Sequence, residues 1–163
     1  MKRFFLWISF LLFVVSATAQ DVAPTNPLFS FNEEGKGEYS LTIHFKKSDI
    51  SGLCVLKNNE NGLAGSVFNE FGIKAFDIIY KTDNQKVTLL NVISFLNKWY
   101  IKRVVKADWR FLFSYPNIKK KDKTRKLTFE DDNRIVLENL KYQTIYTFVP
   151  LSQDKTKLHE AAE

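Results

Sequence analysis

The sequence predicts a mainly β (α+β) protein in which a curled antiparallel sheet, or incomplete barrel, of about eight strands is covered by one long helix. Apolar and polar residues alternate from Tyr39 to Lys46, which is the period of a half-buried strand. Polar turns such as Asn58–Gly62 follow at short intervals. A single helical pattern separates five strand-like segments from three. Parallel βαβ units therefore do not fit, and neighbouring strands are expected to pair antiparallel.

The elements follow from these patterns in chain order. Five strands are expected at residues 39–46, 50–56, 63–69, 73–81 and 87–92. Ser94 can cap a helix that runs to about Phe113, and Pro116 cannot continue it. Three further strands are expected at residues 125–130, 134–140 and 142–148, and Pro150 ends the last of them.

The N-terminus has the layout of a secretory signal peptide over residues 1–19. Lys2 and Arg3 precede an almost purely apolar run at 4–15, and Ala17-Thr18-Ala19 provides a small-residue cleavage site. An uncleaved anchor is the alternative, although the run is short for a bilayer span of about 20 residues. We expect a flexible arm at 20–37, one β-rich domain at 38–151 and a disordered tail at 152–163.

Charge is unevenly distributed along the chain. Residues 98–126 hold eleven Lys or Arg and two Asp, against a formal net charge of +6 for the whole sequence. This concentration of positive charge in one segment suggests which partners the protein could bind, but it does not indicate the fold. Cys54 is the only cysteine and lies in an apolar run, so no internal disulfide can form and we expect a buried small hydrophobic side chain.

The predicted helix has two unlike faces. On a helical wheel, one face is an ordinary core stripe made of Leu96, Tyr100, Val104, Ala107 and Phe111. The other face mixes four cations with the aromatic residues Phe95, Trp99 and Trp109. Either the helix is buried on both sides with lysine stems extending to water, or this face meets an anionic membrane surface or an acidic envelope protein. Asp108 lies near the apolar face and could begin a second short helix.

The candidate membrane or partner surface therefore combines this mixed face with the basic loop that follows the helix. Its residues are Lys98, Trp99, Lys102, Lys106, Trp109, Arg110, Lys119, Lys120 and Lys121.

Catalytic and cofactor motifs are scarce in the sequence. His44 and His159 lack metal-ligand spacing, and neither a glycine-rich phosphate loop nor a Gly-x-Ser-x-Gly elbow occurs. Glu70 and Asp77 flank a predicted bend, and a general acid there would need an apolar pocket. We therefore expect no catalytic residues, no metal and no cofactor, and export argues against a nucleic-acid partner.

Aromatic residues are abundant for a core of this size, with 15 Phe, 6 Tyr and 3 Trp in the whole chain. If the sheet curls only partly, some of these rings line a concavity that takes an apolar ligand, although each ring could equally be plain core. The candidate lining residues are Phe45, Phe68, Phe76, Ile78, Tyr80, Leu89, Tyr146 and Phe148.

Two segments carry a family resemblance. Ser51-Gly52-Leu53-Cys54-Val55 resembles an early strand of the LolB-like lipoprotein-localisation proteins, and residues 63–77 resemble their later strand–Gly-Pro-Leu-Gly–strand element. Residues 69–77 are also similar to a segment of small Bacteroidetes envelope proteins. The resemblance implies an incomplete barrel in the periplasm of a Gram-negative bacterium, with a hollow for lipoprotein acyl chains. The chain departs from LolB in lacking an anchoring cysteine, and from the LolA type in lacking its arginine signature.

Together these patterns predict a non-catalytic periplasmic binding protein for a lipid or a lipoprotein acyl chain, and one candidate role is a lipoprotein carrier. The alternative is a protein-interaction module of a cell-envelope complex that uses the basic helix and loop.

Overall fold

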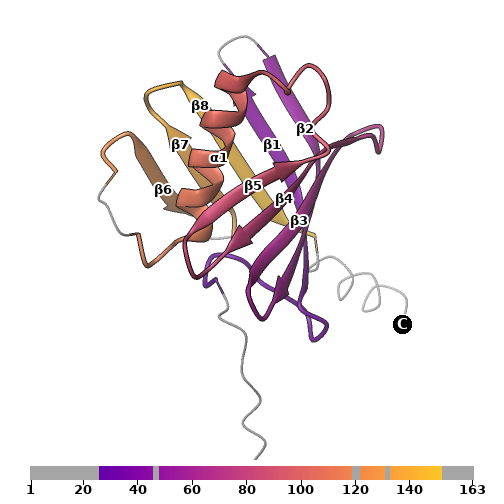
Figure 1. Cartoon of the computed structure of the whole chain (residues 1–163), viewed down its shortest axis with the longest axis vertical. Helices are drawn as coiled ribbons and strands as arrows, with labels where there is room; N and C mark the ends of the chain where they lie inside the picture. The colour runs from indigo at the N-terminus through magenta and orange to yellow at the C-terminus, as the bar shows by residue number, and fades with distance from the viewer. Residues whose placement is uncertain (1–25, 46–47, 119–121, 131–132, 152–163) are drawn as a thin grey trace, which may run out of the picture.

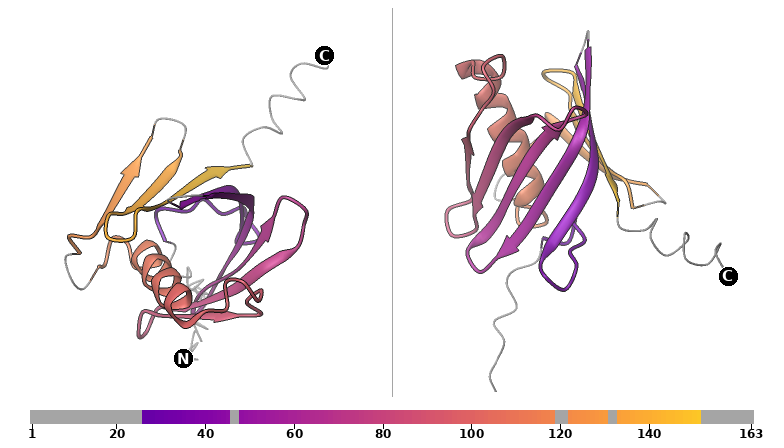
Figure 2. Two further views of the ribbon diagram at one scale, coloured as in Figure 1. Left: turned by 90° about the horizontal axis from the view of Figure 1, so that it is seen from above. Right: turned by 90° about the vertical axis from the view of Figure 1, so that its right-hand side faces the viewer.

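Eight antiparallel strands form one curled, unclosed sheet, and a single helix lies on its concave side (Figures 1 and 2). The computed structural model describes residues 26–45, 48–118, 122–130 and 133–151. The predicted fold class is confirmed. The elements are β1 (Lys36–Phe45), β2 (Ser48–Asn59), β3 (Gly62–Asn69), β4 (Lys74–Lys81), β5 (Lys86–Leu90), α1 (Trp99–Phe113), β6 (Arg125–Phe129), β7 (Ile135–Asn139) and β8 (Thr144–Pro150).

The strand order places the first and last strands side by side in the middle of the sheet. The order is β5-β4-β3-β2-β1-β8-β7-β6, so β5 and β6 form the two edges. Leu41 of β1 lies opposite Phe148 of β8, and Ile43 lies opposite Tyr146. Helix α1 connects one edge strand to the other. Seen from above, it lies across the open side of the curl (Figure 2).

The inward faces of the strands form the core. In β1 the side chains of Tyr39, Leu41 and Ile43 are buried, whereas His44 is exposed. This is the alternation expected for a sheet with one covered face. Cys54 is fully buried in the same core, as predicted, and burial raises the pKa of its thiol.

Helix α1 begins later than the sequence predicts, at Trp99 rather than Ser94. Its N-cap is Lys98, which makes no side-chain capping bond. Residues 93–97 instead form a separate turn, in which the amides of Leu96 and Asn97 donate to the carbonyl oxygen of Ile93. The helix continues through Asp108 without the break considered above, because the Asp108 side chain bonds to the sheet instead of capping a new helix.

The buried face of α1 differs from the one that the wheel predicts. The helix buries Val105, Asp108, Trp109, Leu112 and Phe113, and it exposes Tyr100. Trp109 was expected among the cations but is fully buried, with its ring centroid 5.4 Å from those of Phe113 and Phe148. The interior of the curled sheet is wide enough to accommodate the Trp109 ring. The helix sequence alone could not predict this, because the width is set by the strands.

The segment from Asn26 to Phe31 is packed, which corrects the prediction of a flexible arm for this part of 20–37. Leu28 and Phe29 are buried, and the Phe29 ring packs edge-on against those of Tyr39 and Phe148. The Asn26 amide donates to the carbonyl oxygens of Leu112 (3.1 Å) and Phe113 (2.9 Å) at the end of α1. The segment therefore closes one end of the curled sheet (Figure 1). The predicted signal peptide and tail lie outside the described residues.

Within the described ranges, no helix has both the length and the apolar character needed to cross a membrane.

We predict that Asn26→Ala lowers the free energy of unfolding by about 1–3 kcal/mol, because two buried carbonyl groups lose their donor. Urea unfolding of the full chain measures this change. Ser30→Ala, an exposed side chain in the same segment, should stay within about 0.5 kcal/mol of wild type. Equal stability of the two variants would show that the segment does not hold the helix end.

Candidate functional site

An apolar cavity of about 310 Å³ lies at the end of the sheet opposite the Asn26–Phe31 segment. It is enclosed by the ends of β1 and β2, the β3–β4 turn, the loop before α1 and the first turns of the helix. Leu41 and Ile43 form its inner wall, and Val105 faces it from α1. Four polar residues, Asp49, Ser51, Asn69 and Glu70, border it.

The cavity exists partly because β2 places no side chain at this level. Cys54 and Leu56 fill the inward positions further along the strand, but the next inward position is Gly52, which lines the cavity. A methyl group at Gly52 would overlap the carbonyl oxygen of Phe68, next to the point where the register of β3 against β4 shifts between Val67 and Phe68. The close approach of the strands therefore requires glycine here, and the requirement leaves the space unfilled.

The cavity opens to solvent through a mouth formed by Phe71, Ile73 and Phe95, which all line it. Their exposed fractions are 79%, 55% and 56%. Asn69 fixes the β3–β4 turn, since its Oδ1 accepts the amides of Phe71 (3.1 Å) and Ile73 (2.8 Å). Gly72 takes a φ of 75° between them. A fixed turn thus presents the apolar side chains of Phe71 and Ile73 to water beside the cavity.

Four of the eight predicted ligand-binding residues line this cavity: Phe45, Phe68, Phe76 and Tyr146. The other four, Ile78, Tyr80, Leu89 and Phe148, lie elsewhere in the curl and do not line it. The physical reason is that α1 and the N-terminal segment fill the other end of the curl. Phe148, for example, packs against Trp109 and Phe29.

Sequence reasoning missed the mouth, because Phe71 and Ile73 sit in a bend where polar residues are usual. Two large apolar side chains flanking Gly72 were the available signal.

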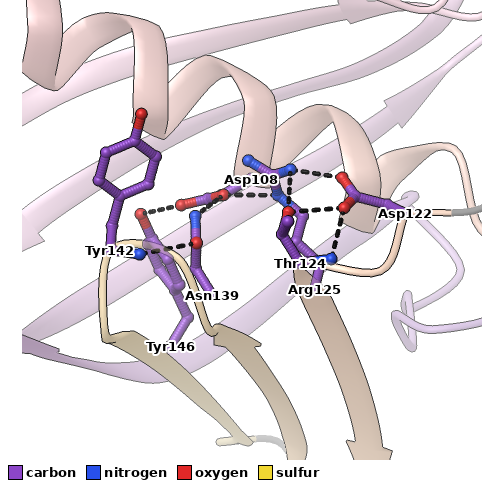
Figure 3. Close-up of polar contacts among 7 residues, drawn as sticks. All are labelled: Asp108, Asp122, Thr124, Arg125, Asn139, Tyr142 and Tyr146. Carbon is purple, nitrogen blue, oxygen red and sulfur yellow. Dashed lines mark hydrogen bonds and ion pairs between the residues drawn. The ribbon is translucent and has the colours of Figure 1, made fainter.

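A buried polar cluster supports the wall formed by Tyr146 (Figure 3). Asp108 is fully buried and accepts hydrogen bonds from Arg125 Nε (2.7 Å), Asn139 Nδ2 (2.7 Å) and the Tyr146 hydroxyl (3.0 Å). Burial raises the pKa of Asp108, and these three donors oppose that effect. Burial and the neighbouring Asp108 also raise the pKa of Tyr146. The Tyr146 ring is therefore fixed in the cavity wall by its own hydroxyl.

Arg125 joins this cluster to the surface. Its guanidinium also pairs with Asp122, whose other oxygen accepts the amide (2.8 Å) and hydroxyl (2.6 Å) of Thr124. The single positive charge of Arg125 is thus shared between a buried and a half-buried carboxylate at the start of β6. We assign this cluster a structural role, because all its donors point to the carboxylates and not into the cavity.

The predicted membrane or partner surface is only partly assembled. Lys98, Trp99 and Arg110 are exposed, whereas Lys102 and Lys106 are half-buried. Trp109 is not part of any surface, because it fills the core. The predicted residues Lys119, Lys120 and Lys121 lie outside the described ranges.

Of the two acids considered in the sequence analysis, Glu70 lines the cavity and Asp77 does not. Partial burial would raise the pKa of Asp77, but hydrogen bonds from Ser66, Asn91 and Lys74 outweigh it and hold that pKa below its usual value. This is the opposite of what a general acid requires. His44 pairs with Asp49 at 2.6 Å on the exposed edge of the mouth. Among the described residues, no three His, Cys, Asp or Glu side chains gather as metal ligands would.

In comparisons with models of known protein families and with curated protein sequences, no family model matches the chain and no curated sequence is significantly similar to it.

We predict that Arg125→Ala costs about 3–5 kcal/mol of stability, because it leaves Asp108 buried without its counter-charge. The neighbouring Lys126→Ala serves as the control, since its exposed pair with Glu138 is worth less than about 1 kcal/mol. Urea unfolding compares the two variants. A loss of similar size in both would mean that the buried pair does not position the helix.

We predict that Asp77→Asn reduces stability at neutral pH and that this difference narrows in acid. The pKa of Asp77 is lowered in the folded protein relative to about 3.9 in the unfolded chain. Its stabilising contribution is therefore complete above that value and disappears as the pH falls through the lower folded pKa. Urea unfolding at pH values from neutrality down to about 2 tests this. A difference that stays constant over the whole series would contradict it.

Proposed function

We propose that this protein binds an apolar ligand without covalent chemistry, in the cavity between the strand ends and α1. The observation that carries the proposal is a water-accessible apolar cavity whose mouth, Phe71, Ile73 and Phe95, is itself apolar and exposed. Burying each methylene group there yields about 0.8 kcal/mol, so five of them contribute about 4 kcal/mol.

The cavity volume limits the ligand class. A dry cavity of about 150 Å³ is enough to hold benzene, and ligand pockets usually begin near 300 Å³. A cavity of about 310 Å³ therefore suits one short alkyl segment or one to two rings. A ligand with several long chains would leave most of its apolar surface outside.

Charge at the mouth narrows the class further. Asp49 and Glu70 border the cavity, and Glu70 is exposed without an ion-pair partner among the described residues. A free carboxylate head group at the mouth would meet these like charges. An acyl chain attached through a neutral ester or amide avoids that repulsion, as does a neutral aromatic compound.

A lipoprotein, which the resemblance to LolB-like proteins suggests as the ligand, meets the charge requirement because neutral ester and amide bonds attach its acyl chains. The cavity would hold only a short segment of one of those chains. The proposal places the protein in the periplasm of a Gram-negative bacterium as a binding protein and not as an enzyme. The location rests on the signal-peptide pattern of residues 1–19.

We predict that Val105→Phe abolishes binding of a neutral apolar probe by filling the cavity. The probe is Prodan, a neutral fluorescent naphthalene derivative with two rings, whose lack of charge prevents retention by the basic surface. The variant should weaken probe binding at least tenfold by fluorescence titration, which corresponds to about 1.4 kcal/mol. Because the new ring enters empty space, stability should change by less than about 1 kcal/mol.

Val67→Phe is the matched control, since Val67 is equally buried but does not line the cavity. It should lose about 1–3 kcal/mol through overpacking while retaining probe binding. Native mass spectrometry of the wild-type protein should show copurified lipid that is absent from Val105→Phe. Unchanged probe binding in Val105→Phe, or no saturable binding in wild type, would rule out the cavity as the site.

A further inference from the structure

A second, polar hollow runs along the side of α1 and is separate from the apolar cavity. It consists of two adjoining depressions of about 550 and 680 Å³ between the helix and the β4–β5 turn. The two share Asn84, Gln85, Ala107 and Arg110, so they form one continuous groove. The small side chain of Ala107 forms the bottom of the groove on the helix side. The side-chain amide of Gln85 donates a hydrogen bond to the carbonyl oxygen of Asn117 (3.0 Å).

Cations line this groove on both sides. Arg103, Lys106 and Arg110 project from the helix, Lys86 from the start of β5 and Lys123 from the loop before β6. The described part of the chain offers no carboxylate partner to any of these five. Asp122 is the one carboxylate in the described lining, and it pairs with Arg125, which also pairs with Asp108. The five cations therefore outnumber the negative charge in the groove.

Local structure does not account for these cations. No acidic residue stands in the first turn of α1, and the one acid within the helix, Asp108, is buried and bound to Arg125. Like charges three or four residues apart destabilise a helix by about 0.2–0.5 kcal/mol per pair. The row of Arg103, Lys106 and Arg110 therefore works against the helix, and an anion in the groove would remove that repulsion.

The spacing of the row indicates more than one anionic group. Seven residues separate Arg103 from Arg110, a distance of about 10 Å along a helix at about 1.5 Å per residue. Planar guanidinium groups hold phosphate oxygens in pairs, whereas lysine acts as a point charge between them. Asn84 Oδ1 accepts the Lys86 amide (3.0 Å), which leaves the Nδ2 group of Asn84 as a neutral donor beside the cations.

We infer that the groove between α1 and the β4–β5 turn binds an anion that carries at least two phosphate groups. Arg103 and Arg110 each hold one phosphate group, and Lys86 and Lys106 neutralise the remaining charge. This site does not depend on the apolar cavity, and it uses Arg103 and Lys86, which lie outside the surface predicted from the sequence. The phosphate groups come either from a free oligophosphate or from the head groups of neighbouring phospholipids.

Calorimetric titration with tripolyphosphate tests the free form at about 0.15 M salt, where weak surface attraction is screened. Arg103→Ala/Arg110→Ala should weaken binding at least tenfold. Lys57→Ala/Lys141→Ala removes the same net charge from exposed positions outside the groove and should change the Kd by less than twofold. Cosedimentation with vesicles of phosphatidylglycerol and phosphatidylcholine tests the lipid form with the same two variants.

The proposed phosphate site is supported if tripolyphosphate or the vesicles bind wild type and only the arginine double variant loses that binding. The probe that binds shows whether the phosphate groups belong to a free oligophosphate or to lipid head groups. Equal losses in both double variants would mean that only net charge matters, and the groove would be overturned. It would also be overturned if neither probe bound wild type saturably, or if binding persisted in the arginine variant. Urea unfolding should show that both double variants fold.

Discussion

A single buried carboxylate fixes how the two halves of this molecule fit together. Asp108 projects from the helix into the core and takes one donor from each of the last three strands, Arg125, Asn139 and Tyr146. A buried ion pair of this kind adds little net stability, but only one rotation of the helix satisfies it. That rotation places Trp109 in the core and Val105 at the cavity, so the position of the site depends on it.

The cavity is the part of the sheet's interior that the protein's own side chains leave unfilled. The Asn26–Phe31 segment, Trp109 and Phe148 pack one end of the interior. At the other end, the loop before α1 contributes Leu96 but leaves space unfilled, and Gly52 leaves that wall without a side chain. The unclosed sheet and its helix therefore enclose a hollow that the exposed residues Phe71, Ile73 and Phe95 line.

Sequence patterns within a few residues predicted the strands, whose positions depend on such local patterns. The strand positions and the order of elements could be derived from alternation and turn residues, because each strand of this sheet is half-buried. The rotation of α1 could not, since Trp109 and Lys106 compete for the interior and Asp108 decides between them through partners far along the chain. The packing of Leu28 and Phe29 was missed for a similar reason, because an irregular segment that closes a barrel end needs no periodicity. Half of the predicted ligand-binding residues line the cavity, and Phe45, Phe76 and Tyr146 do so because they share a strand face with the core.

The pairing of β1 with β8 has a consequence for how the protein reaches its final state. Residues such as His44 and Ile145 lie opposite each other although about a hundred positions separate them, so a long loop must close at an entropic cost before they meet. The other six strand pairings join consecutive strands, so this pairing carries the largest loop-closure cost in the sheet. During synthesis, the first strand has one bare edge until the last strand arrives, and bare edges invite intermolecular pairing.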